Sequence, residues 1–478
     1  MIPALARPLA PFLLAAIGLG AAVASASTPT TLPPRLQQVM MAEGIPATAV
    51  SIVVREASTG DTLLELNAAT SRSPASTMKV LTTWSSLEAL GPNHHWHTRA
   101  YATAAVRNGR LNGDLILVGG GDPGLTAEHW WRFARVLRAT GLQTIDGDIV
   151  IDRSLYKTQS EDPDEFDGKG YRAYNVLPDP LLVNLQSAEF HVHAENGEAR
   201  LLVDPSPANL HVDNRVHATT QGCPQDGRLL RFTTIDADPL HVAIDGAIGP
   251  TCPGYAQRSI MTAPEYAFGT FISFWRSLGG RFDGSLRLAP RPEQSTLVAE
   301  LESDSLAEVV RNTNKWSSNA MARMLLLSLA AERFGAPVGA QDGERALLDF
   351  LESRGLLMPE LVVDNGSGLS RQARISADSL SHTLHAAYHG RYFPEFIASL
   401  PIGGQDGTLR KRFVDLASEA HIRMKTGHLA GVAAIAGYAT TRGGRLLTVV
   451  VMVNAPGAES GRGDAIVDTV VRWALDRR

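Results

Sequence analysis

Apolar residues return at helical spacing in several parts of the chain. From Ser76 to Leu90 they recur every three or four positions until Gly91 ends the run, which predicts an amphipathic helix that starts at Ser76. The same spacing predicts six further helices, over residues 266–278, 306–312, 317–334, 342–354, 377–389 and 465–476. Helices therefore dominate the second half of the chain.

Short apolar runs bounded by turn-forming residues predict strands. Runs at 48–55 and 62–67 flank a Ser-Thr-Gly-Asp turn, and runs at 432–441 and 446–454 flank the tight turn Arg442-Gly443-Gly444-Arg445. A further strand is predicted over 422–425. Helices that frame an antiparallel sheet make an α+β fold.

The pattern changes between residues 97 and 262. Short β-like runs at 115–118, 144–151, 189–193, 199–203 and 229–234 are separated by Gly, Asp and Pro. We interpret 97–262 as a β-rich inserted region with room for two subdomains. Residues 27–96 and 263–478 then form the main domain.

The first 26 residues have the pattern of a secretory signal peptide. Arg7 precedes an apolar stretch from Leu9 to Val23, and Ala24-Ser25-Ala26 is a typical cleavage site. A retained membrane anchor is the alternative, and the prolines that interrupt the stretch disfavour it. Since no later segment is long and apolar enough to cross a bilayer, we expect a periplasmic protein with no stable membrane span.

Composition narrows the range of partners. Of 478 residues 44% are hydrophobic, and the formal net charge of -5 gives no broad basic surface for nucleic acid. In an exported protein, Cys223 and Cys252 are expected to form one structural disulfide. Neither a metal nor a cofactor is expected, because the histidines at 94, 95 and 97 have no carboxylate or cysteine at ligand spacing.

Ser76 and Lys79 are the first candidates for chemistry. Three residues apart on a helix, their side chains lie on one face. A serine hydroxyl must lose its proton to a base as it attacks, and a lysine acts as that base only when burial or a second cation lowers its pKa. The pair by itself is a weak signal because Ser-x-x-Lys recurs by chance on many helices.

Two later motifs strengthen this signal. Ser317-Ser318-Asn319 follows a polar connector at 312–315, and Lys425-Thr426-Gly427 ends a predicted strand, where the glycine allows a ligand backbone to approach. In this order the three motifs resemble the signature set of serine penicillin-binding proteins and β-lactamases.

The spacing of the motifs makes the resemblance more specific. Roughly 240 residues separate Ser76 from Ser317, far more than a connecting loop contains. The chain thus resembles the class C low-molecular-mass penicillin-binding proteins, the D-alanyl-D-alanine carboxypeptidase/endopeptidase family. Stretches at 74–79, 119–123, 364–371 and 405–409 agree with that family. The resemblance implies a β-lactamase/transpeptidase-like domain with a large β-rich insertion.

The resemblance also implies roles for the motif residues. Ser76 attacks the carbonyl between two D-alanines with Lys79 as its base, and Ser317 passes a proton to the departing amine. The other motif residues are expected to bind the substrate, together with the residue that follows the third motif. These residues are Asn319, Lys425, Thr426, Gly427 and His428. The backbone N–H groups of Ser76 and His428 are expected to hold the oxyanion. The implied substrates are peptidoglycan stem peptides and cross-bridges, and β-lactams are implied as covalent inhibitors.

Two positions depart from the family pattern. Ser318 stands where aspartate is commoner, a position that is expected to serve helix packing and not chemistry. His428 stands where serine or threonine is commoner, which predicts weaker carboxypeptidase activity relative to endopeptidase cleavage, or substrate binding that depends on pH. Two alternatives remain beside the peptidase: a β-lactamase, disfavoured because no glutamate has the spacing of a deacylation base, and a catalytically weak envelope scaffold of the same fold.

Overall fold

The computed structural model describes residues 31–157, 161–220, 230–249, 251–252, 254–418 and 421–477. The predicted signal peptide and Cys223 lie outside these ranges, while Cys252 is buried and disulfide-bonded. None of the helices in these ranges is long and apolar enough to span a membrane.

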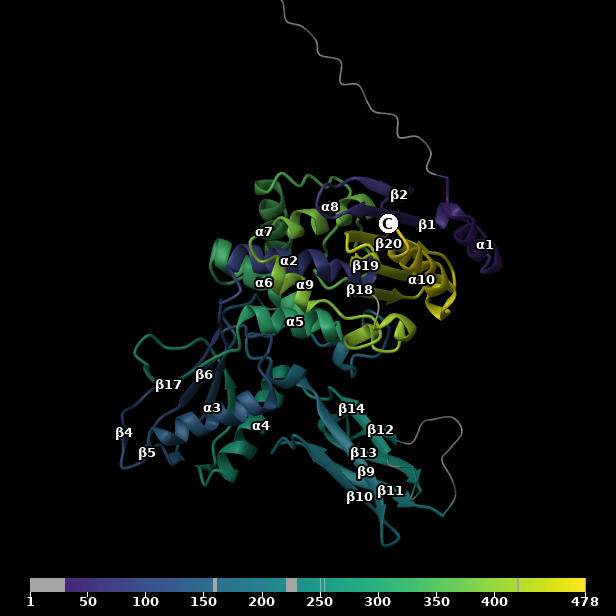
Figure 1. Cartoon of the computed structure of the whole chain (residues 1–478). Helices are drawn as coiled ribbons and strands as arrows, with labels where there is room; N and C mark the ends of the chain where they lie inside the picture. Colours follow the sequence, from purple (N-terminus) through teal and green to yellow (C-terminus); the bar gives the residue numbers. More distant parts are fainter. Residues whose placement is uncertain are drawn as a thin grey trace, which may run out of the picture. The chain divides into compact units, whose positions relative to one another are not determined.

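A five-stranded antiparallel sheet joins the two ends of the described chain (Figure 1). Its order is β18-β19-β20-β1-β2. The strands are β1 (Val50–Glu56), β2 (Thr62–Leu66), β18 (Ile422–Leu429), β19 (Val432–Thr440) and β20 (Leu446–Asn454). Strand β1 pairs with β20 from Val50 opposite Val453 to Glu56 opposite Leu447. The predicted antiparallel sheet and its hairpin are therefore confirmed.

Helices cover both faces of this sheet. On β20, Val449 and Val451 pack in the core that contains α1 (Pro34–Ala42) and α10 (Arg462–Leu475). The alternate residues Val450 and Met452 pack in the opposite core. Helices of that second core are α2 (Met78–Leu90), α5 (Leu306–Trp316), α6 (Asn319–Phe334), α7 (Ala340–Ser353), α8 (Ala377–Tyr388) and α9 (Phe393–Ser399). Because both faces are covered, β20 carries a continuous apolar run from Val449 to Val453 and does not alternate between apolar and polar residues.

The described residues of the inserted region form a core of their own and four sheets. A five-stranded sheet has the order β16-β8-β6-β3-β17, and a four-stranded sheet has the order β15-β7-β5-β4. Their strands are β3 (His97–Ala102), β4 (Val106–Arg107), β5 (Arg110–Leu111), β6 (Leu115–Val118), β7 (Thr144–Ile145), β8 (Ile149–Asp152), β15 (Arg281–Phe282), β16 (Leu286–Leu288) and β17 (Thr296–Glu302). Helices α3 (Ala127–Ala139) and α4 (Ala263–Ser277) contribute to the same core.

Two three-stranded sheets, which we call the outer sheets, complete the inserted region. Their orders are β10-β9-β14 and β11-β13-β12. The strands are β9 (Ala188–Glu195), β10 (Glu198–Asp204), β11 (His211–Ala218), β12 (Leu230–Ile235), β13 (Asp238–Ile248) and β14 (Gly254–Arg258). Along β10, partly buried residues alternate with exposed ones, as expected for a sheet with one solvated face.

Strand pairing and core packing of the inserted region continue beyond residue 262, where the sequence predicts that the insertion ends. Strand β17 pairs with β3 from Thr296 opposite Ala102 to Glu302 opposite His97, and α4 shares the core of the inserted strands. Residues 97–302 therefore pack as the inserted region, and we call residues 32–96 and 303–477 the motif domain. Helix α3 was also missed, although Trp130, Phe133 and Leu137 have helical spacing and Thr126 caps its first turn.

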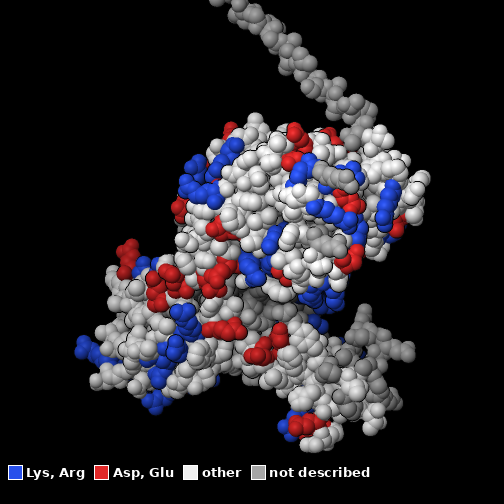
Figure 2. Space-filling model, viewed as in Figure 1, with Lys and Arg blue, Asp and Glu red and all other residues white. Residues whose placement is uncertain are grey.

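Charged residues are interspersed on the surface. On the face drawn in Figure 2, groups of basic residues are neighboured by acidic ones. Ion pairs between oppositely charged side chains include Arg412 with Asp464 and Arg472 with Asp415. This agrees with the small net charge of the sequence.

Candidate active site

Ser76 lies in a single 3-10 turn, η2 (Ala75–Thr77), directly before α2. The prediction of a helix that starts at Ser76 was therefore wrong by two residues, because α2 starts at Met78. Ser76 is half-buried and Lys79 is fully buried. The Nζ atom of Lys79 lies 3.0 Å from the Oγ atom of Ser76, which is hydrogen-bond distance.

Lys79 is held by two more oxygen atoms. Its Nζ donates to Asn319 Oδ1 at 2.6 Å and to the carbonyl oxygen of Ser367 at 2.6 Å. Burial, followed by the positive charge of Lys425, holds the pKa of Lys79 well below its usual value. In the described part of the chain no Asp or Glu forms an ion pair with it. The amine is thus suited to accept a proton from Ser76.

Ser317 forms the junction of two helices. Its φ of 58° is left-handed, and it is the C-cap of α5; Ser318 follows as the N-cap of α6, whose first residue is Asn319. The polar stretch 312–315 belongs to helix α5 and is not the predicted connector. Its polar side chains can lie inside the domain because they form hydrogen bonds there. Asn314 bonds to Ser399 Oγ at 2.9 Å, and the Lys315 ammonium bonds to Asp406 at 2.6 Å.

Strand β18 brings the third motif against the second. Lys425 is fully buried, and its Nζ donates to Ser317 Oγ at 2.8 Å and to the carbonyl oxygen of Thr426 at 2.7 Å. Burial lowers the pKa of Lys425 to about 7. The hydroxyl of Thr426 donates to Thr408 Oγ1 at 2.8 Å. Ser317 therefore lies within reach of a cation that can also attract an anion.

Gly427 lets β18 lie against the turn that carries Ser76. A Cβ atom at Gly427 would lie 2.8 Å from the carbonyl oxygen of Pro74 and 3.0 Å from the backbone nitrogen of Ser76. Both distances are too short for an ordinary carbon contact. The absence of a side chain at Gly427 thus allows the backbone of β18 to lie close to the backbone nitrogen of Ser76.

The comparisons with known proteins agree with this geometry. The profile of the D-Ala-D-Ala carboxypeptidase 3 (S13) family matches residues 33–476. The chain belongs to this family. A D-alanyl-D-alanine carboxypeptidase of Actinomadura sp. is 28% identical over 467 residues, which cover 93% of this chain and 85% of the relative. The D-alanyl-D-alanine carboxypeptidase DacB of Haemophilus influenzae is 24% identical, with 85% of each chain covered.

Solved structures confirm the fold class. The crystal structure of penicillin binding protein 4 from Haemophilus influenzae matches with a TM-score of 0.75 at 20% identity and covers 92% of this chain and 99% of that one. A structure of the same protein complexed with a β-lactam matches with a TM-score of 0.73 at 21% identity, over 93% of this chain and 100% of that one. The predicted α+β, β-lactamase/transpeptidase-like fold is confirmed.

The two departures from the pattern of the S13 family have distinct local structures. Ser318 is the N-cap of α6, and its hydroxyl accepts from the Met321 N–H at 3.4 Å, a role that serine fills as well as aspartate. The Nε2 atom of His428 lies 3.0 Å from both carboxylate oxygens of Asp464, which also pairs with Arg412. The imidazole is thus anchored to α10.

Sequence reasoning missed several partners of the motifs. The Ser367 carbonyl accepts from Lys79, the Tyr174 carbonyl accepts from Asn319, and Thr408 accepts from Thr426. Backbone carbonyls leave no residue-type signal. The glycine at 368, next to Ser367, was the one signal in the sequence. A Cβ atom there would lie 1.8 Å from the carbonyl oxygen of Ala75, so only glycine allows this segment to approach the turn that carries Ser76.

Among the described residues, no group of three or more His, Cys, Asp or Glu side chains is arranged to hold a metal ion. The histidines discounted in the sequence lie near acidic side chains, with His97 3.1 Å from Glu300 and His95 3.7 Å from Glu302.

Proposed function

We propose that this member of the S13 family is a serine-type D-alanyl-D-alanine peptidase that acts through an acyl-enzyme on Ser76. The observation that carries the proposal is the 3.0 Å contact between Ser76 Oγ and the buried Nζ of Lys79. A neutral amine at this distance accepts the hydroxyl proton as Ser76 attacks the carbonyl carbon.

The second lysine serves binding and proton transfer. Lys425 attracts the terminal carboxylate of the substrate, and its charge disfavours protonation of Lys79. Ser317, which accepts a hydrogen bond from Lys425, passes a proton to the departing amine. Thr426 donates to the substrate carboxylate, and Asn319 bonds to Lys79 and to the peptide of the substrate.

The oxyanion is held by the backbone N–H groups of Ser76 and His428. The close approach of Gly427 to the Ser76 nitrogen supports this pairing. Water then releases the acyl group. β-Lactams follow the same first step, because a strained amide beside a carboxylate resembles D-Ala-D-Ala, and they are proposed as covalent inhibitors.

Labelling with benzylpenicillin tests the proposal. Intact-protein mass spectrometry of the wild type should show one penicilloyl adduct, which peptide mapping places on Ser76, and Ser76→Ala should show none. Folded wild-type protein without an adduct would favour the scaffold alternative. Rapid loss of the adduct with multiple turnover of penicillin would favour the β-lactamase alternative.

The natural substrate is proposed to be peptidoglycan in the periplasm. Digestion of purified sacculi separates the two activities of the family, because loss of cross-linked dimers indicates endopeptidase action and loss of pentapeptides indicates carboxypeptidase action. Export is tested by fractionating cells, and Edman sequencing of the mature protein should begin at Ser27. Retention of residues 1–26 in the membrane fraction would contradict the signal peptide.

A further inference from the structure

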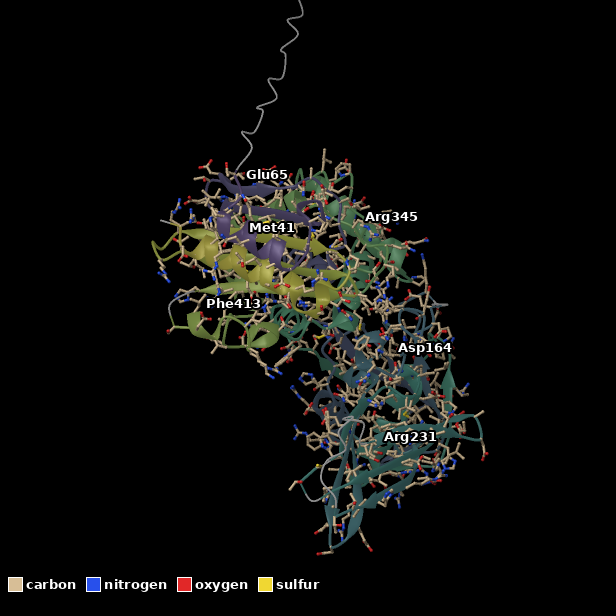
Figure 3. The ribbon with its side chains drawn as sticks, turned by 90° about the vertical axis from the view of Figure 1, so that its right-hand side faces the viewer. Met41, Glu65, Asp164, Arg231, Arg345 and Phe413 are labelled. Atoms are coloured by element: carbon tan, nitrogen blue, oxygen red, sulfur yellow. The ribbon has the colours of Figure 1, made fainter. Side chains whose placement is uncertain are left out.

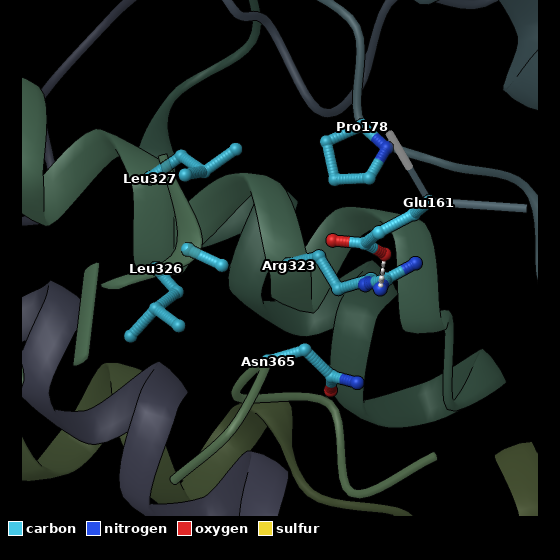
Figure 4. Close-up of a pocket in the computed structure, with 7 residues that line it drawn as sticks. Glu161, Pro178, Arg323, Leu326, Leu327 and Asn365 are labelled. Atoms are coloured by element: carbon cyan, nitrogen blue, oxygen red, sulfur yellow. Dashed lines mark hydrogen bonds and ion pairs between the residues drawn. The ribbon is translucent and has the colours of Figure 1, made fainter. Parts of the chain in front are cut away.

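One segment of the inserted region, residues 161–175, contacts the helix that carries the second motif. Glu161 forms an ion pair with Arg323 of α6 (Figure 4). The short helix η3 (Ala173–Asn175) at the end of the segment packs against α6. Asn319 and Arg323 are four residues apart and thus lie on one face of α6. The segment therefore contacts this face at two points.

Apolar packing holds the chain that follows the segment. Val176 and Leu182 share a buried cluster with Ala320 and Met324 of α6. These two α6 residues are also four apart, so a second stripe of the helix is covered by the inserted region. Contacts of α6 with the inserted region are thus both polar and apolar.

The Asn319 amide links this segment to Lys79. Its Nδ2 donates to the carbonyl oxygen of Tyr174 at 2.9 Å, and its Oδ1 accepts from Lys79 Nζ at 2.6 Å. A backbone carbonyl can only accept, so the NH₂ group of the amide must face Tyr174 and its oxygen must face Lys79. An amide turned by half a rotation would donate to the amine lone pair that has to receive the Ser76 proton.

A single exposed carboxylate holds the turn that presents the Tyr174 carbonyl. Asp167 accepts from the Tyr174 hydroxyl at 2.7 Å and from the Asn175 amide at 2.7 Å. Asn175 is buried and also donates to the Lys169 carbonyl at 3.0 Å. Asp164, labelled in Figure 3, accepts from the Gly170 N–H at 2.6 Å and closes the same segment.

We propose that the turn 167–175 is a positioning element of the active site, in which Asp167 fixes the Tyr174 carbonyl and thereby the orientation of the Asn319 amide toward Lys79. This inference rests on the function proposed above. Asp167 is a positioning residue, because it acts through Asn319 and touches neither Ser76 nor Lys79. The inserted region thus contributes to acylation from outside the three motifs.

A double-mutant cycle tests the inference. Acylation by benzylpenicillin is followed by timed quenching and intact mass in the wild type, Asp167→Ala, Asn319→Ala and the double variant. Asp167→Ala should slow acylation about tenfold in the wild-type background and less than twofold when Asn319 is already alanine, as expected for residues coupled through one hydrogen-bond network. Benzylpenicillin carries no cationic group, so a direct ion pair with Asp167 cannot cause the loss.

Two matched variants serve as controls. Asp162→Ala removes the same charge from the segment but only a contact to the Asp164 N–H, and it should acylate within twofold of the wild type. Tyr174→Phe removes one of the two bonds to Asp167 and keeps the carbonyl, so its acylation rate should be intermediate. Near-ultraviolet circular dichroism establishes that each variant is folded.

The outcomes are distinct. Equal slowing by Asp167→Ala in both backgrounds, no slowing in the wild-type background, or equal slowing by Asp162→Ala would each overturn the positioning role. If Asp167→Ala fails to fold, an unchanged rate in Tyr174→Phe would overturn it. Absence of a Ser76 adduct in the folded wild type would instead refute the proposed peptidase function.

Discussion

The sheet of the motif domain and the outer sheets of the inserted region are built from the same element but differ in burial. Every residue of β19 except the last is buried, whereas β10 alternates and leaves Leu202 58% exposed. Lys79 on α2 and Lys425 on strand β18 of the covered sheet are fully buried, and this burial lowers the pKa of each. Chemistry that needs a neutral lysine is thus confined to the covered sheet.

The largest effect should come from Lys79. If the buried lysine is the base, Lys79→Met should slow acylation by benzylpenicillin by about 10³- to 10⁴-fold, the upper range for loss of a general base. Stopped-flow kinetics on protein checked for a native thermal transition would measure it. A loss below tenfold would mean that burial near the covered sheet has no catalytic purpose.

The second largest effect is expected on stability, when matched substitutions are made in the motif domain and in an outer sheet of the inserted region. Ile435→Ala on β19 removes a fully buried side chain and should lower the free energy of unfolding by about 2 to 5 kcal/mol. The matched change Leu202→Ala on β10 should alter it by less than about 0.5 kcal/mol, because the site is exposed. Urea denaturation measures both, and equal losses would contradict the difference in burial.

The rate of acylation should depend on pH through both lysines. Deprotonation of Lys425 should lower the rate at high pH, and protonation of Lys79 should lower it at low pH. Lys425 has a pKa lowered to about 7, so it is cationic below that pH and loses its attraction for a carboxylate above it. Acylation by benzylpenicillin should therefore fall as the pH rises above about 7. It should also fall when the pH drops through the lowered pKa of Lys79, because the ammonium cannot accept a proton.

Replacing Lys425 by arginine sharpens this test. Lys425→Arg keeps the charge at all accessible pH values, so the fall above about pH 7 should disappear. Persistence of the fall in this variant would mean that another group causes it. Rate constants measured from pH 5 to 10 with constant ionic strength distinguish the two.

The smallest effect is expected at His428. Its imidazole is anchored to Asp464, so His428→Ser should place a hydroxyl beside the bound carboxylate. We expect kcat/KM for release of D-alanine to rise about three- to tenfold, the value of one additional hydrogen bond. Asp464→Asn leaves the ring in place and should stay within about twofold. An unchanged kcat/KM in His428→Ser would refute a role of His428 in substrate preference.

The sequence by itself determined the three motifs, their order, the five strands of the motif-domain sheet and most of its helices, although α1 and α9 were not predicted. Ser76 and Lys79 are neighbours on one helical turn, so their contact follows from local spacing alone. The apolar runs at 432–441 and 446–454 likewise predict the strands β19 and β20 and the tight turn between them. Family membership followed from the same residues and is confirmed by the profile match over 33–476.

Only the tertiary structure decided the contacts between distant segments. The pairing of β17 with β3 moved the end of the inserted region to 302, because strand pairing is a property of two segments and not of either one. Lys79 meets Asn319 and the Ser367 carbonyl, and Asn319 meets the Tyr174 carbonyl. Backbone carbonyls are present at every residue, so no sequence pattern marks the few that position catalytic side chains.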